Sequence, residues 1–258
     1  MLKSLVTVLF LFLSSNLLAA TPDAHIVKLQ GTVYVLHNQG GETRVDKPGY
    51  LVNRLDTVLT REGGRAVLKF NDGTVSVLDE KSSLRIEKSG WISQLGGKVY
   101  YLFSKLVGAK RSKTVTTSFA TIGIRGTEFI VNVENDNDTI VLKKGHLKVA
   151  APEGEYEIHH KTLDSDNFDL YREQQWSGVN EYLKEFDGYR DNLNAEFIEY
   201  RKELSMGAGQ VVRFAGNRVD SMQLTDRLNN EFLDMHDFAA PFITEENGPD
   251  LNDHTGFK

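Results

Sequence analysis

The sequence contains no cysteine among its 258 residues. This absence excludes disulfide scaffolds, cysteine nucleophiles and thiolate metal sites. An excess of basic residues is also lacking, because the net charge is -6 and the pI is near 5.7. Nucleic-acid-binding proteins usually present excess Lys and Arg, so we expect no nucleic-acid partner. With 40% hydrophobic residues, the chain can bury a core in one or two domains.

Apolar runs long enough to cross a bilayer are missing too. The run near the N-terminus extends from Leu5 to Leu13, broken only by Thr7, whereas a spanning helix needs about 20 residues. Lys3 before the run and Ala19-Ala20 after it complete the pattern of a secretory signal peptide. We expect residues 1–20 to be removed on export, leaving no stable membrane insertion; an uncleaved anchor is the alternative.

Residues 21–160 follow a period of two. Apolar and polar residues alternate over residues 66–70, Asp72-Gly73 interrupts, and the alternation resumes at residues 75–77. Asp-Gly between such runs predicts a β-hairpin, because a type I′ turn needs positive φ at both central residues. Lys144-Gly145 predicts a second hairpin by the same argument. The region is therefore expected to be antiparallel and all-β, which argues against parallel α/β folds.

Residues 161–243 follow a helical period instead. Apolar residues recur at steps of three and four, which is a heptad seam about four repeats long. The seam consists of Trp176, Val179, Leu183, Phe186, Leu193, Phe197, Tyr200 and Leu204. It predicts a helix that forms a coiled coil or packs on its own domain. A second helix is expected over residues 221–237, with Leu224, Leu228, Phe232 and Met235 on one face, and residues 244–258 are expected to form a flexible tail.

Charge changes sign at the same boundary. Residues 21–160 carry 19 bases and 16 acids, whereas residues 161–258 carry 10 bases and 20 acids. Between Lys88 and Thr127 there are seven bases and no acid, interleaved with aromatic residues. Such a stretch predicts a surface for an anionic glycan or an acidic polypeptide; the alternative is neutralisation by the acidic helices of the same chain. The candidate residues are Lys98, Lys105, Lys110, Arg111, Lys113, Trp91 and Tyr100.

One segment resembles the hallmark of the FecR domain. It runs from Thr121 to Val133 and contains the core Arg125-Gly126-Thr127-Glu128-Phe129. Upstream, residues 55–60, Gly64-Arg65-Ala66 and Asp72-Gly73-Thr74 are similar to the family's acid, threonine and Gly-Arg-Ala run before an Asp-Gly turn. Downstream, residues 139–142 and 145–149 resemble its closing hairpin. The likeness covers roughly residues 31–149.

The resemblance implies an extracytoplasmic all-β module, elongated as a twisted sandwich or solenoid-like, of a kind known from regulators that relay envelope signals to sigma factors. The best-known members carry a cytoplasmic sigma-binding arm and a membrane span. This chain, which begins with the predicted leader, is closer to free-standing secreted members. We therefore expect a periplasmic location. The partner is expected to be an envelope protein or a second copy of the chain, with an anionic glycan as a further candidate.

The hallmark residues have a structural interpretation. Gly126 can adopt positive φ or allow close backbone approach, as at a β-bulge. Phe129, Val131 and Val133 then share one face and Ile130 the other. Arg125 and Glu128 are expected to pair with one another or with turn groups, although ligand contact is the alternative.

No catalytic motif stands out. The sequence lacks the Gly-x-Ser-x-Gly elbow, the phosphate-binding loop and the His-Glu-x-x-His helix. His159-His160 and the acidic residues 134–138 are interpreted as strand and turn residues rather than metal sites. We expect a non-catalytic binding or sensory module without cofactors. A structural or cell-wall glycan-binding protein is the alternative, and a hydrolase with two facing carboxylates is a third.

Overall fold

The structure is a computed structural model that describes residues 22–87, 91–103, 113–134, 137–160 and 197–243. Within these ranges the chain forms strands, the α-helix α4 (Asp226–Ala239) and the short 3-10 helix η2 (Ala240–Phe242). The predicted mainly β fold with a helix near the C-terminus is confirmed. Among the described helices, none is long and apolar enough to cross a membrane.

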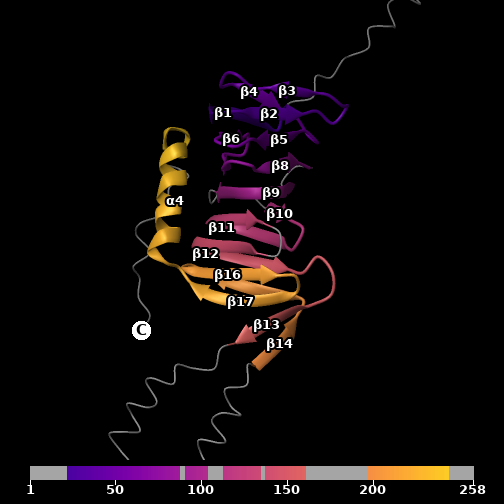
Figure 1. Ribbon diagram of the computed structural model, residues 1–258, viewed down its shortest axis with the longest axis vertical. Coiled ribbons are helices and arrows are strands. Elements are labelled where there is room, and N and C mark those ends of the chain that lie inside the picture. The colour runs from indigo at the N-terminus through magenta and orange to yellow at the C-terminus, as the bar shows by residue number, and fades with distance from the viewer. Residues whose placement is uncertain (1–21, 88–90, 104–112, 135–136, 161–196, 244–258) are drawn as a thin grey trace, which may run out of the picture.

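Backbone hydrogen bonds arrange the strands in two rows that follow the long axis of the molecule (Figure 1). In pairing order, the first row contains β4 (Tyr50–Val52), β1 (Ala24–Gln30), β6 (Arg65–Phe70), β7 (Val75–Leu78), the second half of β9 (Trp91–Leu102), the second half of β11 (Thr121–Val133), the first half of β12 (Asp138–Ala150), β16 (Gln210–Ala215), β17 (Arg218–Gln223), β13 (Tyr156–His160) and β14 (Phe197–Arg201).

The second row contains β3 (Glu42–Arg44), β2 (Val33–Leu36), β5 (Thr57–Thr60), β8 (Ser83–Ile86), the first half of β9, β10 (Lys113–Thr116), the first half of β11, the second half of β12 and β15 (Glu203–Gly207). The described pairings are antiparallel except for β9–β10 and β13–β17, which are parallel. The rows share β9, β11 and β12, and each of these strands contains a glycine at positive φ: Gly97, Gly126 and Gly145.

β11 and β12 both bend from one row to the other, and this bend depends on Gly126 and Gly145. Arg125 lies opposite His146 and Glu128 opposite Lys144, so Gly126 and Thr127 together face Gly145. The extra residue makes this a β-bulge, which bends the strand. The bulge expected at Gly126 is confirmed. The hairpin expected at Lys144-Gly145 is wrong, because β12 continues through it. Gly145 adopts a φ of +90° to bend the strand, not to reverse it.

The Asp72-Gly73 hairpin is confirmed between β6 and β7. Gly73 has a φ of +83°, and Asp72 accepts a 2.9 Å hydrogen bond from the Thr74 N–H. Asp72 itself is not at positive φ, so the turn is not the expected type I′ turn. Asn71, Asp72 and Gly73 instead form a three-residue loop closed by the Phe70 N–H to Thr74 carbonyl bond.

The main core contains side chains from both rows. Alternate residues such as Ile26, Leu68 and Val99 from the first row, and Val35, Val58 and Leu84 from the second, are fully buried in one cluster. Phe129 and Val131 belong to the same cluster, while Ile130 belongs to another, which confirms the alternation expected for β11.

A second apolar cluster covers the other face of the first row. Its sheet residues include Val67, Val77 and Tyr100, and its helical residues are Phe232, Met235 and Ala239 of α4. Figure 1 shows α4 running along the long axis and across the strands. The part of the first row beneath α4 is therefore buried on both faces, which explains why all four residues of β7 are buried.

Part of the predicted helical region is sheet. Residues 197–223 form β14 to β17, and these strands pair with β12 and β13 of the preceding region. A helix beginning at residue 221 is therefore wrong, since Thr225 caps α4 and Asp226 is its first residue. The predicted apolar face is correct, because Phe232 and Met235 are buried and Leu224 and Leu228 pack against them.

A single substitution tests whether Gly145 is required where β11 and β12 bend from one row to the other. A Cβ atom at position 145 would lie 2.6 Å from Thr127 Cγ2 and 2.7 Å from the Gly126 carbonyl oxygen. Positive φ costs about 1–3 kcal/mol for a residue with a side chain, and forced overpacking costs a similar amount. We expect Gly145→Ala to lower the free energy of unfolding by about 3–5 kcal/mol in urea denaturation.

Gly41→Ala is the matched control. Gly41 has the same φ of +90° but nothing within 4 Å of its added Cβ atom. It should lose only the strain, about 1–3 kcal/mol. Equal losses in the two variants would show that the close approach is not what constrains the bend.

Candidate interaction surfaces

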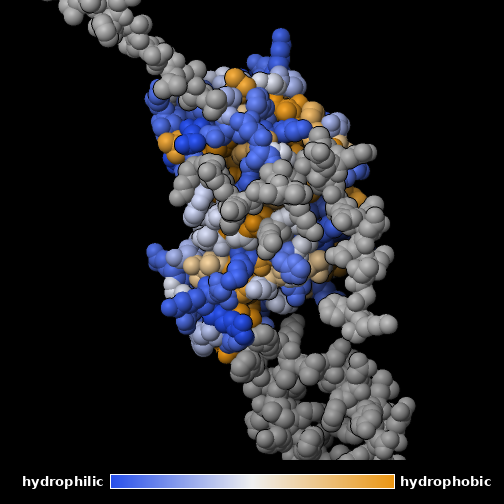
Figure 2. All heavy atoms as spheres, turned by 180° about the vertical axis from the view of Figure 1, so that it is seen from behind, coloured by the Kyte–Doolittle hydropathy of each residue, from blue (hydrophilic) through white to orange (hydrophobic). Residues whose placement is uncertain are grey.

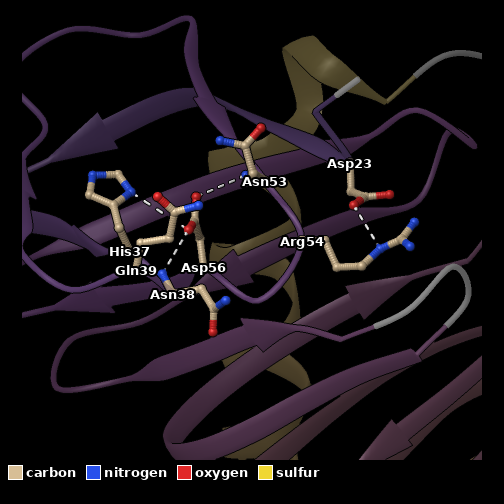
Figure 3. Close-up of a pocket in the computed structure, with 7 residues that line it drawn as sticks. All are labelled: Asp23, His37, Asn38, Gln39, Asn53, Arg54 and Asp56. Carbon is tan, nitrogen blue, oxygen red and sulfur yellow. Dashed lines mark hydrogen bonds and ion pairs between the residues drawn. The ribbon is translucent and has the colours of Figure 1, made fainter. Parts of the chain in front are cut away.

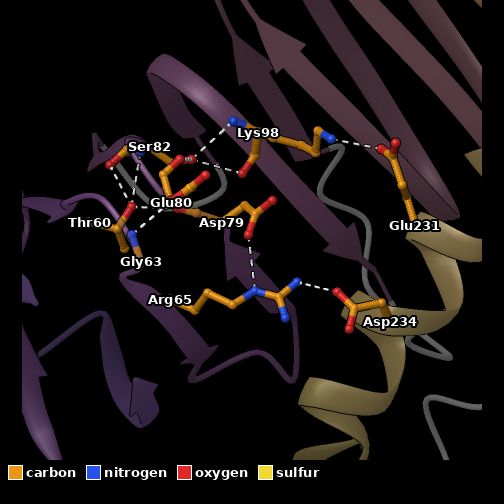
Figure 4. A network of polar contacts seen from close by, with 9 residues as sticks. All are labelled: Thr60, Gly63, Arg65, Asp79, Glu80, Ser82, Lys98, Glu231 and Asp234. Carbon is orange, nitrogen blue, oxygen red and sulfur yellow. Dashed lines mark hydrogen bonds and ion pairs between the residues drawn. The ribbon is translucent and has the colours of Figure 1, made fainter. Parts of the chain in front are cut away.

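Four basic side chains from four strands of the first row hold α4 in place. Figure 4 shows two of these contacts, those of Arg65 with Asp234 and of Lys98 with Glu231. The pairs are Lys28 with the Phe238 carbonyl at 3.0 Å, Arg65 with Asp234 at 2.5 Å, Lys98 with Glu231 at 2.7 Å, and Lys143 with the Asn229 side chain. The helical partners follow one another along α4 in the same order as their strands follow in the row. We call these four contacts the clasp.

The clasp changes the interpretation of the basic and aromatic stretch. Lys98 is paired within the chain, as the alternative of intramolecular neutralisation predicts for it. Tyr100 is fully buried, packs edge-on against Phe232 at 6.1 Å, and donates a hydrogen bond to Glu128 at 3.2 Å. Burial and the nearby Glu128 charge raise the pKa of the Tyr100 phenol far above its usual value. Tyr100 is thus a core residue and not part of an exposed surface.

The remaining candidates of that stretch are separated. Lys113 forms an ion pair with Asp72 and donates to the Thr74 hydroxyl at 3.2 Å, and burial lowers the pKa of its amine to about 8. Trp91 lies on β9 with 37% of its surface exposed. Lys105, Lys110 and Arg111 lie outside the described residues. Of the described candidates, Trp91 is the one classed as exposed. The described candidates therefore do not form a joint basic and aromatic surface.

The clasp can be measured by a double-mutant cycle. Lys98 and Glu231 are both less than one-third exposed, so their charges are partly shielded from water. We expect the cycle through Lys98→Met and Glu231→Gln to give a coupling free energy of about 1 kcal/mol in urea denaturation at low salt.

Lys148 and Glu203 supply the control pair. They are 3.1 Å apart across β12 and β15, but their side chains are 70% and 60% exposed. A cycle through Lys148→Met and Glu203→Gln should give coupling near zero. Indistinguishable coupling in the two cycles would argue against a specific role for the clasp.

The described hallmark residues lie at the bulge and in the main core. Phe129 is fully buried, with its ring stacked 5.1 Å from Tyr101 and 5.9 Å from Phe103. Glu128 accepts the Tyr100 hydroxyl hydrogen bond. The Phe103 N–H donates to the Thr127 carbonyl at 3.0 Å, and Arg125 faces His146 in the ladder. These contacts agree with the structural interpretation.

The predicted helical seam lies mostly outside the described residues. This applies to Trp176, Val179, Leu183, Phe186 and Leu193. The last three members, Phe197, Tyr200 and Leu204, lie on strands β14 and β15, so a helix there is wrong. Over residues 198–206 apolar residues also recur at a period of two, as Ile198 with Tyr200 and Leu204 with Met206. Cross-strand pairing selects that period.

Three exposed residues with large apolar side chains lie on strands near the end of the first row. The register places Ile198 and Tyr200 of β14 on the face opposite Ile158, which is in the core. Met222 of β17 lies on this same outer face, because its partner Val211 belongs to the cluster beneath α4. Ile198, Tyr200 and Met222 are 38%, 60% and 46% exposed. We call these three residues the terminal face.

A polar pocket lies near the other end of the molecule (Figure 3). Its volume is about 750 Å³, and it is formed by the turn after β2, the loop between β4 and β5, and the residue preceding β1. The lining residues are Asp23, His37, Asn38, Gln39, Asn53, Arg54 and Asp56. Figure 3 shows Arg54 and Asp23 on one side, paired at 3.5 Å, and the other five residues together.

Buried Asp56 organises the pocket. Its side chain is 5% exposed and accepts backbone N–H groups of Asn38 at 3.3 Å and Asn53 at 3.0 Å. His37 Nδ1 lies 3.6 Å from the same carboxylate. Asp56 therefore connects two loops that are not adjacent in sequence. Sequence reasoning missed the site, although the polar residues 37–39 and the polar positions 53, 54 and 56 were a visible signal.

The residues considered for metal binding lie on a turn and on a strand where the structure describes them. Asp138 accepts the Glu134 N–H at 2.7 Å, which closes the turn between β11 and β12, and Asp136 lies outside the described residues. His159 and His160 are consecutive residues of β13. In the described ranges, no three His, Asp or Glu residues are grouped as metal ligands would be.

Comparison with known proteins supports the family resemblance. The family model described as "FecR protein" matches residues 56–151, which confirms the FecR-type domain. No curated protein sequence matches the chain. Two crystal structures titled as "a putative anti-sigma factor from Parabacteroides distasonis ATCC 8503" align with a TM-score of 0.44, at 12% and 11% identity. Each alignment covers 69% of this chain, which spans 64% and 63% of those two chains, just under two thirds.

Proposed function

From the FecR domain that this chain carries over residues 56–151, we propose that the protein is a non-catalytic periplasmic module that binds a protein partner in envelope signalling. The match to that family is the observation that carries the proposal. The elongated sandwich or solenoid-like form expected from the sequence suits the role, because two rows with a shared core hold distant surfaces in fixed relation. Binding needs no catalytic residues, only a complementary surface.

The terminal face is the site we assign to that contact. β14 pairs with β13 on one side, and within the described ranges no further strand pairs with its other edge. An edge strand can extend its sheet by pairing with a partner polypeptide. Tyr200 supplies a large side chain that is 60% exposed, and tyrosine is enriched where binding energy concentrates. The partner is an envelope protein or a second copy of this chain.

Site-specific crosslinking tests this contact. A photoreactive amino acid at position 200 should give one discrete crosslinked product in intact cells. Ile198→Asp places a charge beside it on the terminal face and should reduce that product by about tenfold or more. Mass spectrometry of the product separates an envelope partner from self-association.

Position 148 is the control for crosslinking. Lys148 is well exposed but lies in the second row, so a photoreactive residue there should not give the same product. A product common to both positions, or one that Ile198→Asp leaves unchanged, would contradict the assignment of the terminal face.

The proposed location has its own test. We expect the mature protein to be recovered from the periplasm with Thr21 as its first residue. Leu9→Arg should leave the precursor in the cytoplasm, because a charge interrupts the apolar part of the leader; Leu9→Ile should be exported normally. Wild-type precursor retained in the cytoplasm at full length would contradict a periplasmic role.

A further inference from the structure

We propose that the polar pocket near the β2–β3 turn binds a neutral saccharide. The proposal concerns a different end of the molecule from the terminal face, and it does not depend on the protein contact. Figure 1 places the β2, β3 and β4 strands at one end of the long axis and β14 at the other. A partner protein and a saccharide therefore have separate sites on the same chain.

The lining of the pocket excludes other ligand classes. All seven lining residues have polar or charged side chains, so a lipid or another apolar ligand would cover polar groups without replacing their hydrogen bonds to water. The charges of Asp23 and Arg54 already pair at 3.5 Å. A phosphate or another strong anion would meet one arginine and two carboxylates, Asp23 and Asp56. Charge therefore favours an uncharged ligand.

The side chains match the hydrogen-bonding pattern of a sugar. Asn38, Gln39 and Asn53 are exposed side-chain amides, and each offers both donors and an acceptor. A sugar hydroxyl also donates and accepts, so each hydroxyl can donate to an amide oxygen or accept from an amide N–H. An N-acetyl group presents an amide of its own and pairs with the same residues. A volume of about 750 Å³ accommodates a short oligosaccharide rather than a single ion.

The loops are held in place before a ligand arrives. Asp56 accepts a backbone N–H from each of the two loops. Between Arg54 and Asp56, Leu55 adopts a φ of +68° while its N–H donates to the Ile86 carbonyl at 2.6 Å. A branched residue in the left-handed region carries strain. The surroundings hold this conformation, and it separates buried Asp56 from exposed Arg54. Rigid loops reduce the entropy lost on binding.

Binding is expected to be weak because it relies on hydrogen bonds exchanged with water. Titration calorimetry of the mature chain with N,N′,N″-triacetylchitotriose and with maltotriose should give a Kd on the order of 0.1–1 mM for at least one sugar. Inorganic phosphate should not bind at the same concentrations. Both trisaccharides are uncharged, so the comparison between them separates recognition of acetamido groups from recognition of hydroxyls.

Variants connect binding to the pocket. Asn53→Ala and Gln39→Ala remove exposed side chains and leave the Asp56 carboxylate and its backbone donors in place. Each should weaken binding by about tenfold, with an unchanged free energy of unfolding. Lys148→Ala, far away in the second row, should bind as the wild type does.

Three outcomes would overturn the proposal. They are absence of binding by both trisaccharides at about ten times the expected Kd, equal binding by wild type and both pocket variants, and preferential binding of phosphate. None of these bears on crosslinking at position 200. The saccharide site and the protein contact are therefore tested independently of each other.

Discussion

The close approach of β11 and β12 at Gly126 and Gly145 is the constraint on which the fold depends. Two residues of β11 face one of β12, with no room for a side chain at position 145. The resulting bend carries both strands from one row to the other, so a single ladder contributes to both walls of the main core. The Arg-Gly-Thr-Glu-Phe segment spans this bend, which gives its glycine and phenylalanine a structural purpose.

The middle of the first row is buried on both faces. One face meets the second row, and α4 covers the other through Phe232, Met235 and Ala239. The excess of bases in the strands and of acids near the C-terminus is resolved in part within the chain, because the clasp pairs strand bases with helical acceptors. The terminal face and the polar pocket, near the two ends of the molecule, are the surfaces that we propose for partners.

Local patterns predicted local structure well. Alternation placed Phe129 and Ile130 on opposite faces, Asp72-Gly73 marked a hairpin, and the apolar face of α4 was identified although its start was not. The same rules failed at Gly145 and at residues 197–204. A glycine between two apolar runs is compatible with a turn or with a bend. Phe197, Tyr200 and Leu204 fit a helical period, while Ile198, Tyr200, Leu204 and Met206 fit a strand period.

The sequence by itself determined the mainly β character, the family to which residues 56–151 are matched, and the division of charge along the chain, because each is written in neighbouring residues. Only the tertiary structure decided which segment pairs with which. Asp56 joins two loops, Lys98 meets Glu231, and β13 pairs with β17. Such contacts depend on where distant segments come together, and hydrogen bonds and burial between them outweigh the local preference of a short segment.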